Sequence, residues 1–243
     1  MSNNTQLTAK IEPFDTFWEA PENIEKGYKS FNKFYKRNYL KYIPYNKESK
    51  ILIVSCGTGY FVELLQKEGF HNVMGIDSDP EKAEYARQRS LNCKVERAFD
   101  FLEKRGEYFD VIIAEQEINH LTKEEILLFL KLCWDNLNKD GVLIIHSLNG
   151  GNPIIGSESL AQNFNHYNTF TEYSIKQILT YSNFKEIKVF PLKLYVFYEN
   201  PLNYVGLVLD SLVNIFLRLI FLFYGKANRI FSKKIAAFCR KKA

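Results

Sequence analysis

The sequence predicts an α/β fold in which a doubly wound, mostly parallel sheet carries helices on both faces. From residue 50 onward, short apolar runs alternate with amphipathic segments, and this alternation is typical of strand–helix units joined by right-handed crossovers. The first apolar run, residues 51–55, has the composition of a strand that is buried on both faces. The chain has 243 residues, of which 46% are hydrophobic, so it is long enough to bury such a core.

A helix is predicted before the sheet, over residues 22–42. Its aromatic side chains recur at steps of three and four and therefore share one face, and Pro44 ends it. We interpret this face as core packing. The sheet elements are then expected in the following order: strand 51–55, helix 61–68 stopped by Gly69, strand 73–77, helix 81–89 started by Pro80, strand 93–97, strand 109–114, helix 123–138 capped by Thr122, a turn at Asp140 and Gly141, strand 142–148, a helix from the Thr171 cap to Ser182, and an extended segment 187–198.

The C-terminal part of the chain has a different pattern. Residues 202–224 are nearly all apolar, and Asp210, Asn214 and Arg218 form one narrow polar stripe. The segment is long enough to span a bilayer, but an Asp and an Arg near its middle make that costly, so we predict a surface or interfacial helix. Cations follow it, which is typical of a helix that lies on an anionic bilayer; burial against the domain or in a homodimer is the alternative. Residues 229–242 could form a final strand.

Composition excludes several classes of protein. The net charge of +4 is mild for this length and gives no reason to expect a nucleic-acid-binding protein. The four cysteines are scattered and form no C-x-x-C pair, which excludes a disulfide scaffold and a zinc ribbon. The four histidines show no i, i+4 pairing, so no metal site is expected. The polar N-terminus has no apolar h-region, so we expect no signal peptide and a cytoplasmic location.

The strongest local signal is the run Val-Ser-Cys-Gly-Thr-Gly at residues 54–59, between the first strand and the first helix. Small residues there let the backbone approach a ligand, and the N–H groups of the helix start favour polar groups. Asp77 ends the second strand, where its carboxylate can accept hydrogen bonds from both ribose hydroxyls of an adenosine. The alternative is a tight turn without a ligand, with Asp77 capping the next helix. A dinucleotide is disfavoured because the third glycine of G-x-G-x-x-G would stand at Val62.

Further segments extend this pattern from about residue 34 to residue 184. They are FYKRNYLKYIP, ILIVSCGTGYFVELLQKEGFHNVMGIDSDPEKAEYA, YFDVIIAEQEINHL, LNKDGVLIIHSLNG and NHYNTFTEYSIKQILTYSNF, with IFSKKIAAFCRK near the C-terminus. In these segments the chain resembles class I S-adenosylmethionine-dependent methyltransferases, and among them the bacterial subgroup linked to surface glycans and lipid-linked saccharides. The resemblance implies a seven-stranded sheet with an antiparallel last strand. It divides the chain into residues 1–45, a methyltransferase domain at 46–200, a helical insertion at 201–228 and a last strand with a basic tail at 229–243.

The resemblance also implies roles for individual residues. Gly57 and Gly59 would line the methionine moiety of S-adenosylmethionine, Asp77 would hold the ribose, and Ser78 would flank the adenine. The complete set expected to bind the cofactor is Ser55, Gly57, Thr58, Gly59, Asp77, Ser78, Asp100, Glu115 and Gln116.

Several positions depart from the family pattern. Ile53 replaces the acid usual in strand one, and Ser55 replaces the first glycine of the turn. Arg97 stands where the adenine-binding acid is usual, and Asp100, three residues on, could substitute. Asn119 replaces the Glu before the motif histidine. These departures predict either a reduced affinity for the cofactor or a non-catalytic relative.

A hydroxyl acceptor would need a base near the end of the fourth strand, and His120, His166 and Glu117 are the candidates. His120 could instead bond the backbone at a helix start, and His166 could be an exposed loop residue. His146 alternates within a strand and is expected to be structural. A further hypothesis is that Tyr35 or Tyr39 covers the cofactor as a lid.

The predicted function is methyl transfer from S-adenosylmethionine to an oxygen of a saccharide or lipid-linked saccharide, a substrate class that follows from the resemblance alone. One alternative is a weak or inactive methyltransferase-like protein that binds a partner or a glycan. Another is a small-molecule methyltransferase that acts on a quinone or lipid. The expected partners are the acceptor, a membrane contacted through residues 202–224 at the inner face, and a second copy of the chain, but no nucleic acid.

Overall fold

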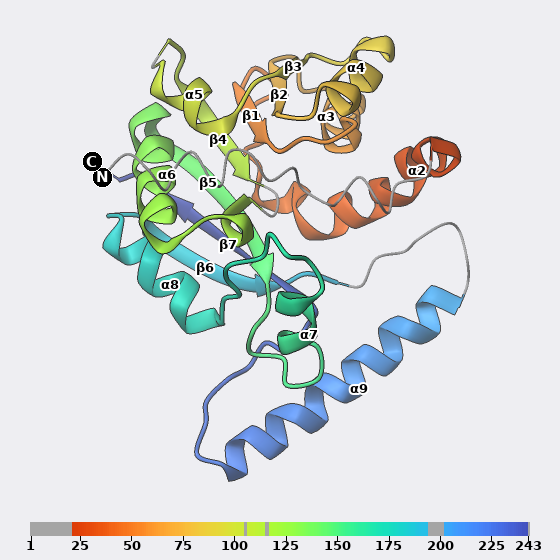
Figure 1. Ribbon diagram of the computed structural model, residues 1–243, viewed down its shortest axis with the longest axis vertical. Coiled ribbons are helices and arrows are strands. Elements are labelled where there is room, and N and C mark those ends of the chain that lie inside the picture. Colours follow the sequence, from red (N-terminus) through yellow and green to blue (C-terminus); the bar gives the residue numbers. More distant parts are fainter. Residues whose placement is uncertain (1–20, 105, 115–116, 194–201, 243) are drawn as a thin grey trace.

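The computed structural model describes residues 21–104, 106–114, 117–193 and 202–242. Its centre is a seven-stranded sheet, and Figure 1 shows how the helices are arranged around it. The strand order is β3-β2-β1-β4-β5-β7-β6. Strands β1 to β5 pair in parallel, and β7 lies antiparallel between β5 and β6. The predicted doubly wound sheet with an antiparallel last strand is therefore confirmed. Its strands are β1 (Ile51–Val54), β2 (Val73–Asp77), β3 (Cys93–Val95), β4 (Phe109–Ala114), β5 (Leu137–Leu148), β6 (Lys185–Pro191) and β7 (Lys234–Arg240).

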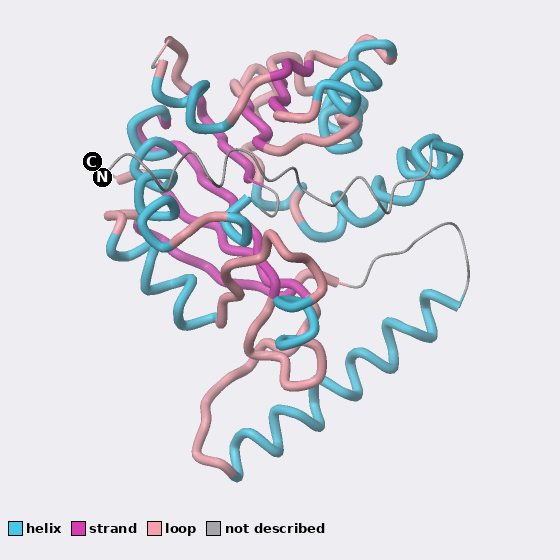
Figure 2. Tube along the Cα trace, in the orientation of Figure 1, coloured by secondary structure: helices cyan, strands magenta, loops and turns pink. Residues whose placement is uncertain are grey.

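Helices pack on both faces of this sheet, but the last helix of the chain stands apart from the strands (Figure 2). They are α2 (Pro21–Asn38), α3 (Tyr60–Lys67), α4 (Pro80–Gln88), α5 (Ala98–Glu103), α6 (Lys123–Asn136), α7 (Gly156–Ala161), α8 (Glu172–Tyr181) and α9 (Leu202–Phe223), with short 3-10 turns η2 (Leu40–Tyr42) and η3 (Glu117–His120). The Thr122 and Thr171 side chains accept hydrogen bonds from the third residue of α6 and α8, as their positions in the sequence predict.

The alternation of side chains along β1 divides the core into two layers. Leu52 and Val54 point to the layer under α5, α6 and α8, and Ile51 and Ile53 point to the layer under α2 and α3. All four are fully buried, which explains why the strand is apolar throughout instead of alternating.

Three local expectations need correction. β5 begins at Leu137, so the expected turn at Asp140 and Gly141 lies inside the strand. Asp140 has a φ of 61°, and its N–H donates to the Lys241 carbonyl at 2.9 Å, so the irregular residue is held by the segment after β7. The short helices α5 and α7 were not predicted, because six residues are too few for a helical period to stand out in the sequence. The strand expected over residues 93–97 ends at residue 95, and Arg97 already stands at the position before the first residue of α5.

The aromatic face of α2 packs into the core, as predicted. Tyr35 stacks on Phe61 with ring centroids 4.2 Å apart, and Tyr39 is fully buried. The Tyr39 hydroxyl bonds Nδ1 of His146 on β5. Both tyrosines are thus part of the packed interior, and the side chain that reaches the glycine turn from this helix is Tyr28.

Burial of His146 predicts a dependence of stability on pH. Burial lowers the pKa of His146 well below its usual range, and Lys234 adds to this effect. The native state therefore excludes a proton that the unfolded chain binds below about pH 6.5. The free energy of unfolding should fall by up to about 1.4 kcal/mol for each pH unit below that value.

Denaturant titrations between pH 7.5 and 5.5 measure this slope. The slope should be reduced in His146→Leu and unchanged in His71→Gln, since His71 is an exposed histidine. Equal slopes in the wild type and His146→Leu would contradict the prediction.

Candidate active site

The glycine turn between β1 and α3 has an unusual backbone. Ser55, Gly57 and Gly59 have φ values of 56°, 55° and 86°, which lie in the left-handed region. Glycine adopts this region without steric cost, so the sequence Gly57-Thr58-Gly59 suits the turn. Ser55 adopts the same region where the family usually has glycine.

The two glycines serve different purposes. A Cβ on Gly59 would lie 2.8 Å from Leu91 Cδ1 and 3.1 Å from Ala86 Cβ, so this residue lets the turn pack closely on neighbouring elements. A Cβ on Gly57 would meet nothing within 4 Å. Gly57 therefore presents its backbone toward open space, where a ligand can approach it.

Gly59→Ala should destabilise the protein more than Gly69→Ala does. Both glycines have nearly the same φ, 86° and 87°, but a Cβ on Gly69 would meet no atom within 4 Å. The left-handed backbone alone should cost about 1–2 kcal/mol in each variant. Overpacking at Gly59 should cost about 1–3 kcal/mol more. Chemical denaturation measures both costs, and equal losses would show that the close contacts at Gly59 relax freely.

Asp77 at the end of β2 is bonded to the turn. Its Oδ2 accepts the Gly57 N–H at 2.8 Å, and its Oδ1 accepts the Asp79 N–H at 2.9 Å. Burial raises the pKa of Asp77, and these two hydrogen bonds oppose that shift. The alternative in which Asp77 caps α4 is wrong, because the capping side chain is Asp79, which accepts the N–H groups of Glu81 and Lys82. Asp77 and the turn thus form one unit at the carboxyl edge of the sheet.

The side on which an adenine is expected is more open. Ser78 is exposed, and Asp100 is exposed in the first turn of α5. The acid that follows β3 directly is Glu96, whose N–H donates to the Asp77 carbonyl at 2.9 Å. The Glu96 carboxylate pairs with Lys104 at 2.9 Å. Glu96 is therefore an acid beside Asp77 that the family spacing did not indicate.

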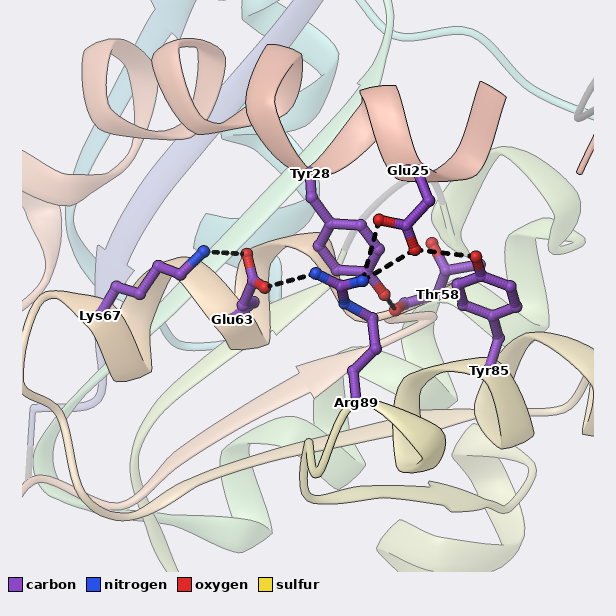
Figure 3. Close-up of polar contacts among 7 residues, drawn as sticks. All are labelled: Glu25, Tyr28, Thr58, Glu63, Lys67, Tyr85 and Arg89. Atoms are coloured by element: carbon purple, nitrogen blue, oxygen red, sulfur yellow. Dashed lines mark hydrogen bonds and ion pairs between the residues drawn. The ribbon is translucent and has the colours of Figure 1, made fainter. Parts of the chain in front are cut away.

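A cluster of polar side chains joins α2, α3 and α4 above the glycine turn (Figure 3). Arg89 at the end of α4 lies between Glu25 of α2 at 2.7 Å and Glu63 of α3 at 3.1 Å. The Arg89 guanidinium also lies over the Tyr28 ring, 3.9 Å from its centroid, and the Tyr28 hydroxyl donates to the Thr58 carbonyl at 2.5 Å. Helix α2 is therefore attached directly to the turn that is expected to bind the cofactor.

The two histidines expected near the acceptor lie side by side, although they are 46 positions apart in the sequence. The ring centroids of His120 and His166 are 4.9 Å apart. Nδ1 of His166 lies 2.8 Å from the Ser159 carbonyl, which can only accept, so Nδ1 carries the proton in this contact. Nε2 of neutral His166 then holds a lone pair, as a general base requires.

Asn119 brings this pair together. Its side chain is fully buried, donates to the Asn168 carbonyl at 2.7 Å and accepts the Leu148 N–H at 3.2 Å. The backbone carbonyl of Asn119 accepts the Tyr167 N–H at 2.9 Å. The residue that replaces the family's glutamate thus holds the His166 loop against the end of β5, a role that the sequence did not reveal.

The remaining candidates lie where the structure gives less detail. Glu115 and Gln116 are outside the described residues, and so is the side chain of Glu117, which begins η3. Ile53, at the position of the usual acid in strand one, is fully buried in the core.

Comparison with known proteins agrees with this geometry. Residues 51–141 match a family described as "Methyltransferase domain". A search of curated proteins finds no match.

Solved structures of methyltransferases share the fold. A SAM-dependent methyltransferase from Archaeoglobus fulgidus is 20% identical, with a TM-score of 0.64 over 90% of this chain and 98% of that one. A possible histamine N-methyltransferase from Thermotoga maritima is 16% identical, with a TM-score of 0.59 over 90% of each chain. The magnesium protoporphyrin IX methyltransferase of Synechocystis, solved with SAH, is 12% identical, with a TM-score of 0.52 over 91% of this chain and 84% of that one.

The match over residues 51–141 and these solved structures show that the chain has the fold of class I methyltransferases. The comparisons agree with the expected enzyme class and cofactor, a methyltransferase that uses S-adenosylmethionine.

Proposed function

We propose that the protein transfers the methyl group of S-adenosylmethionine to a hydroxyl oxygen of a saccharide or lipid-linked saccharide. The observation that carries this proposal is the placement of two groups at one edge of the sheet. Asp77 and the glycine turn follow β2 and β1, and the His120–His166 pair lies beside the ends of β4 and β5. Ligands of such sheets bind at this edge.

The residues present fit an adenosine cofactor. The backbone at Gly57 faces open space, and the Asp77 carboxylate uses one hydrogen bond on each oxygen, which leaves acceptor capacity for ribose hydroxyls. The departures at Ile53 and Arg97 remove acids at two other positions, so we expect affinity to depend strongly on Asp77.

The chain's own groups would position the reactants and accept a proton. S-adenosylmethionine supplies an electrophilic methyl group when it is bound. Asp77 would hold the ribose, and the turn would hold the methionine end through its backbone. Nε2 of His166 would take the proton of the acceptor hydroxyl as the oxygen attacks, with His120 packed beside it.

The saccharide acceptor rests on the family resemblance. The exposed apolar helix α9 adds support for the lipid-linked form, because an acceptor with a lipid carrier stays at a membrane. The same helix also favours a second candidate, a lipid or quinone acceptor, which differs in placing the reacting group directly on the apolar molecule.

Calorimetry and a transfer assay test the proposal. The protein should bind both S-adenosylmethionine and S-adenosylhomocysteine. It should also transfer a labelled methyl group to a saccharide-bearing lipid extract, with the label released by glycan hydrolysis. Label retained on the lipid moiety would favour the quinone or lipid acceptor, and binding without transfer to any fraction would favour the inactive relative. Absence of cofactor binding would reject the enzyme.

A further inference from the structure

Helix α9 turns apolar side chains outward and polar side chains toward the rest of the chain, whereas a surface helix of a soluble protein does the opposite. An 18-residue window within Tyr204–Phe223 has a mean hydropathy of 2.1, and only 6% of that window is buried. The polar residues Asp210 and Asn214 are partly buried beside Leu217, on the side that faces the rest of the chain. Ten outward side chains are apolar and 39–89% exposed: Val205, Val208, Leu209, Leu212, Val213, Ile215, Phe216, Leu219, Leu222 and Phe223. Ser211 and Arg218 are exposed polar residues of the same helix.

The polar residues of α9 are used by the protein itself. Oδ1 of Asn214 accepts the Phe231 N–H at 3.1 Å, and Nε of Arg218 donates to the Arg229 carbonyl at 2.6 Å. The Phe221 and Phe231 rings also meet edge to face, 4.6 Å apart. Two of the polar residues of the stripe, Asn214 and Arg218, therefore attach α9 to residues 229–231. They leave its other side free of charge.

We propose that α9 lies in the plane of a lipid bilayer, with its outward face among the lipid chains, and does not cross it. At 100° per residue, the outward positions cover about half of the helix circumference. A single partner helix would cover a narrower stripe, as in a coiled coil, whereas the surface of a bilayer covers half a helix. Exposed cations at Lys226, Arg229 and Lys233 follow the helix and suit an anionic lipid surface.

The topology of the sheet excludes a membrane span. β6 and β7 pair directly, with Pro191 opposite Ile235, so the segment containing α9 leaves and rejoins one sheet. Residues 192–201 and 224–233 connect α9 to these strands, ten residues on each side. If α9 crossed the roughly 30 Å hydrocarbon layer, one connection would have to return through it as extended chain. Its backbone groups would then lack hydrogen-bond partners, which lipid does not tolerate.

The segment that follows α9 is bonded to the same end of β5 as the candidate active site. Asn149, directly after β5, donates to the Ile230 and Ser232 carbonyls at 3.0 and 2.8 Å. Asn152 donates to the Phe231 carbonyl at 2.6 Å. The segment that carries α9 is thus held at the end of β5, where Asn119 also holds the His166 loop. A membrane at α9 would present lipid-carried molecules to this edge, but the proposal itself holds whatever the acceptor is.

Vesicle flotation tests the proposal with the full chain. The wild type should float with vesicles of 70% phosphatidylcholine and 30% phosphatidylglycerol, and more weakly with phosphatidylcholine alone or in high salt. The double variant Leu212→Asp, Phe216→Asp should lose at least tenfold in the bound fraction. The control variant Leu127→Asp, Leu128→Asp changes two exposed leucines on α6 and should bind as the wild type does. Unchanged S-adenosylmethionine binding by the α9 variant would verify that it folds.

A depth measurement distinguishes lying from spanning. Val205→Cys, Leu212→Cys and Leu219→Cys place a fluorescent label on one face at steps of seven residues, and unlabelled background is read from the wild type, whose four cysteines are buried. Quenching by spin-labelled lipids should report one shallow depth at all three positions. A maximum depth at position 212 would overturn the in-plane helix. Failure of the wild type to float, or a dimer in light scattering that the double Asp variant abolishes, would overturn the lipid partner.

Discussion

Replacement of His166 by alanine should lower kcat for methyl transfer about 10²- to 10⁴-fold, the range typical for loss of a general base. The reason lies in the contact of Nδ1 with the Ser159 carbonyl at 2.8 Å, which fixes the tautomer and leaves a basic lone pair on Nε2. The dissociation constant for S-adenosylmethionine should stay unchanged, because the residues expected to bind the cofactor lie on other loops. Single-turnover kinetics at saturating cofactor measure the effect.

Two further measurements separate a base from a structural residue. The acidic limb of the pH–rate profile should disappear in His166→Ala, and a loss of rate that is the same at every pH would contradict the assignment. His71→Ala is the matched control. It removes an exposed histidine that is not among the candidate site residues, so kcat should stay unchanged. If His120→Ala instead removed the acidic limb while His166→Ala kept it, His120 would be the base.

The strands and helices of the sheet could be predicted because the signals for each element lie within its own residues. Strands such as β1 and β4 are short apolar runs, and α6 and α8 carry their own caps at Thr122 and Thr171. The antiparallel position of β7 came from the family resemblance. Helices α5 and α7 escaped prediction because each has only six residues. Strand β5 begins before Asp140 because Leu137 pairs with Phe109 of β4 and the Asp140 N–H donates to the Lys241 carbonyl.

The part of the candidate site whose role depends on particular residue types could be predicted from the sequence. The turn at residues 54–59 and Asp77 stand out by spacing, and the structure joins them through the Gly57 N–H. Contacts between distant segments gave no such signal. The bond from Tyr28 to Thr58 and the placement of Arg89 depend on how α2 packs, which no local pattern encodes.

Asn119 shows the limit of reading a motif by its residue types. At this position the resemblance indicated only a missing acid. The amide group is needed because it must donate to one carbonyl and accept one N–H in the same buried place, and a carboxylate could only accept. The residue that the resemblance marks as a missing acid thus has a structural role, because it joins the His166 loop to the end of β5.

Replacement of Asp77 by alanine should weaken S-adenosylmethionine binding by about 1–3 kcal/mol, or about 5- to 150-fold in the dissociation constant, through the loss of two ribose hydrogen bonds. The change also removes the acceptor of the Gly57 N–H at 2.8 Å, so the turn loses order before any ligand arrives. Isothermal titration calorimetry at pH 7.5 measures the dissociation constant.

Asp79→Ala is the matched control for Asp77→Ala. It removes a neighbouring acid that caps α4, so it should lower stability by about 1 kcal/mol and leave the dissociation constant unchanged. Acidification gives a second test of the same carboxylate. Burial raises the pKa of Asp77, so protonation should begin to weaken binding at a higher pH than for an exposed aspartate, and Asp77→Ala should not show this dependence. An Asp77→Ala protein that binds the cofactor as tightly as the wild type, at any pH, would place the ribose elsewhere.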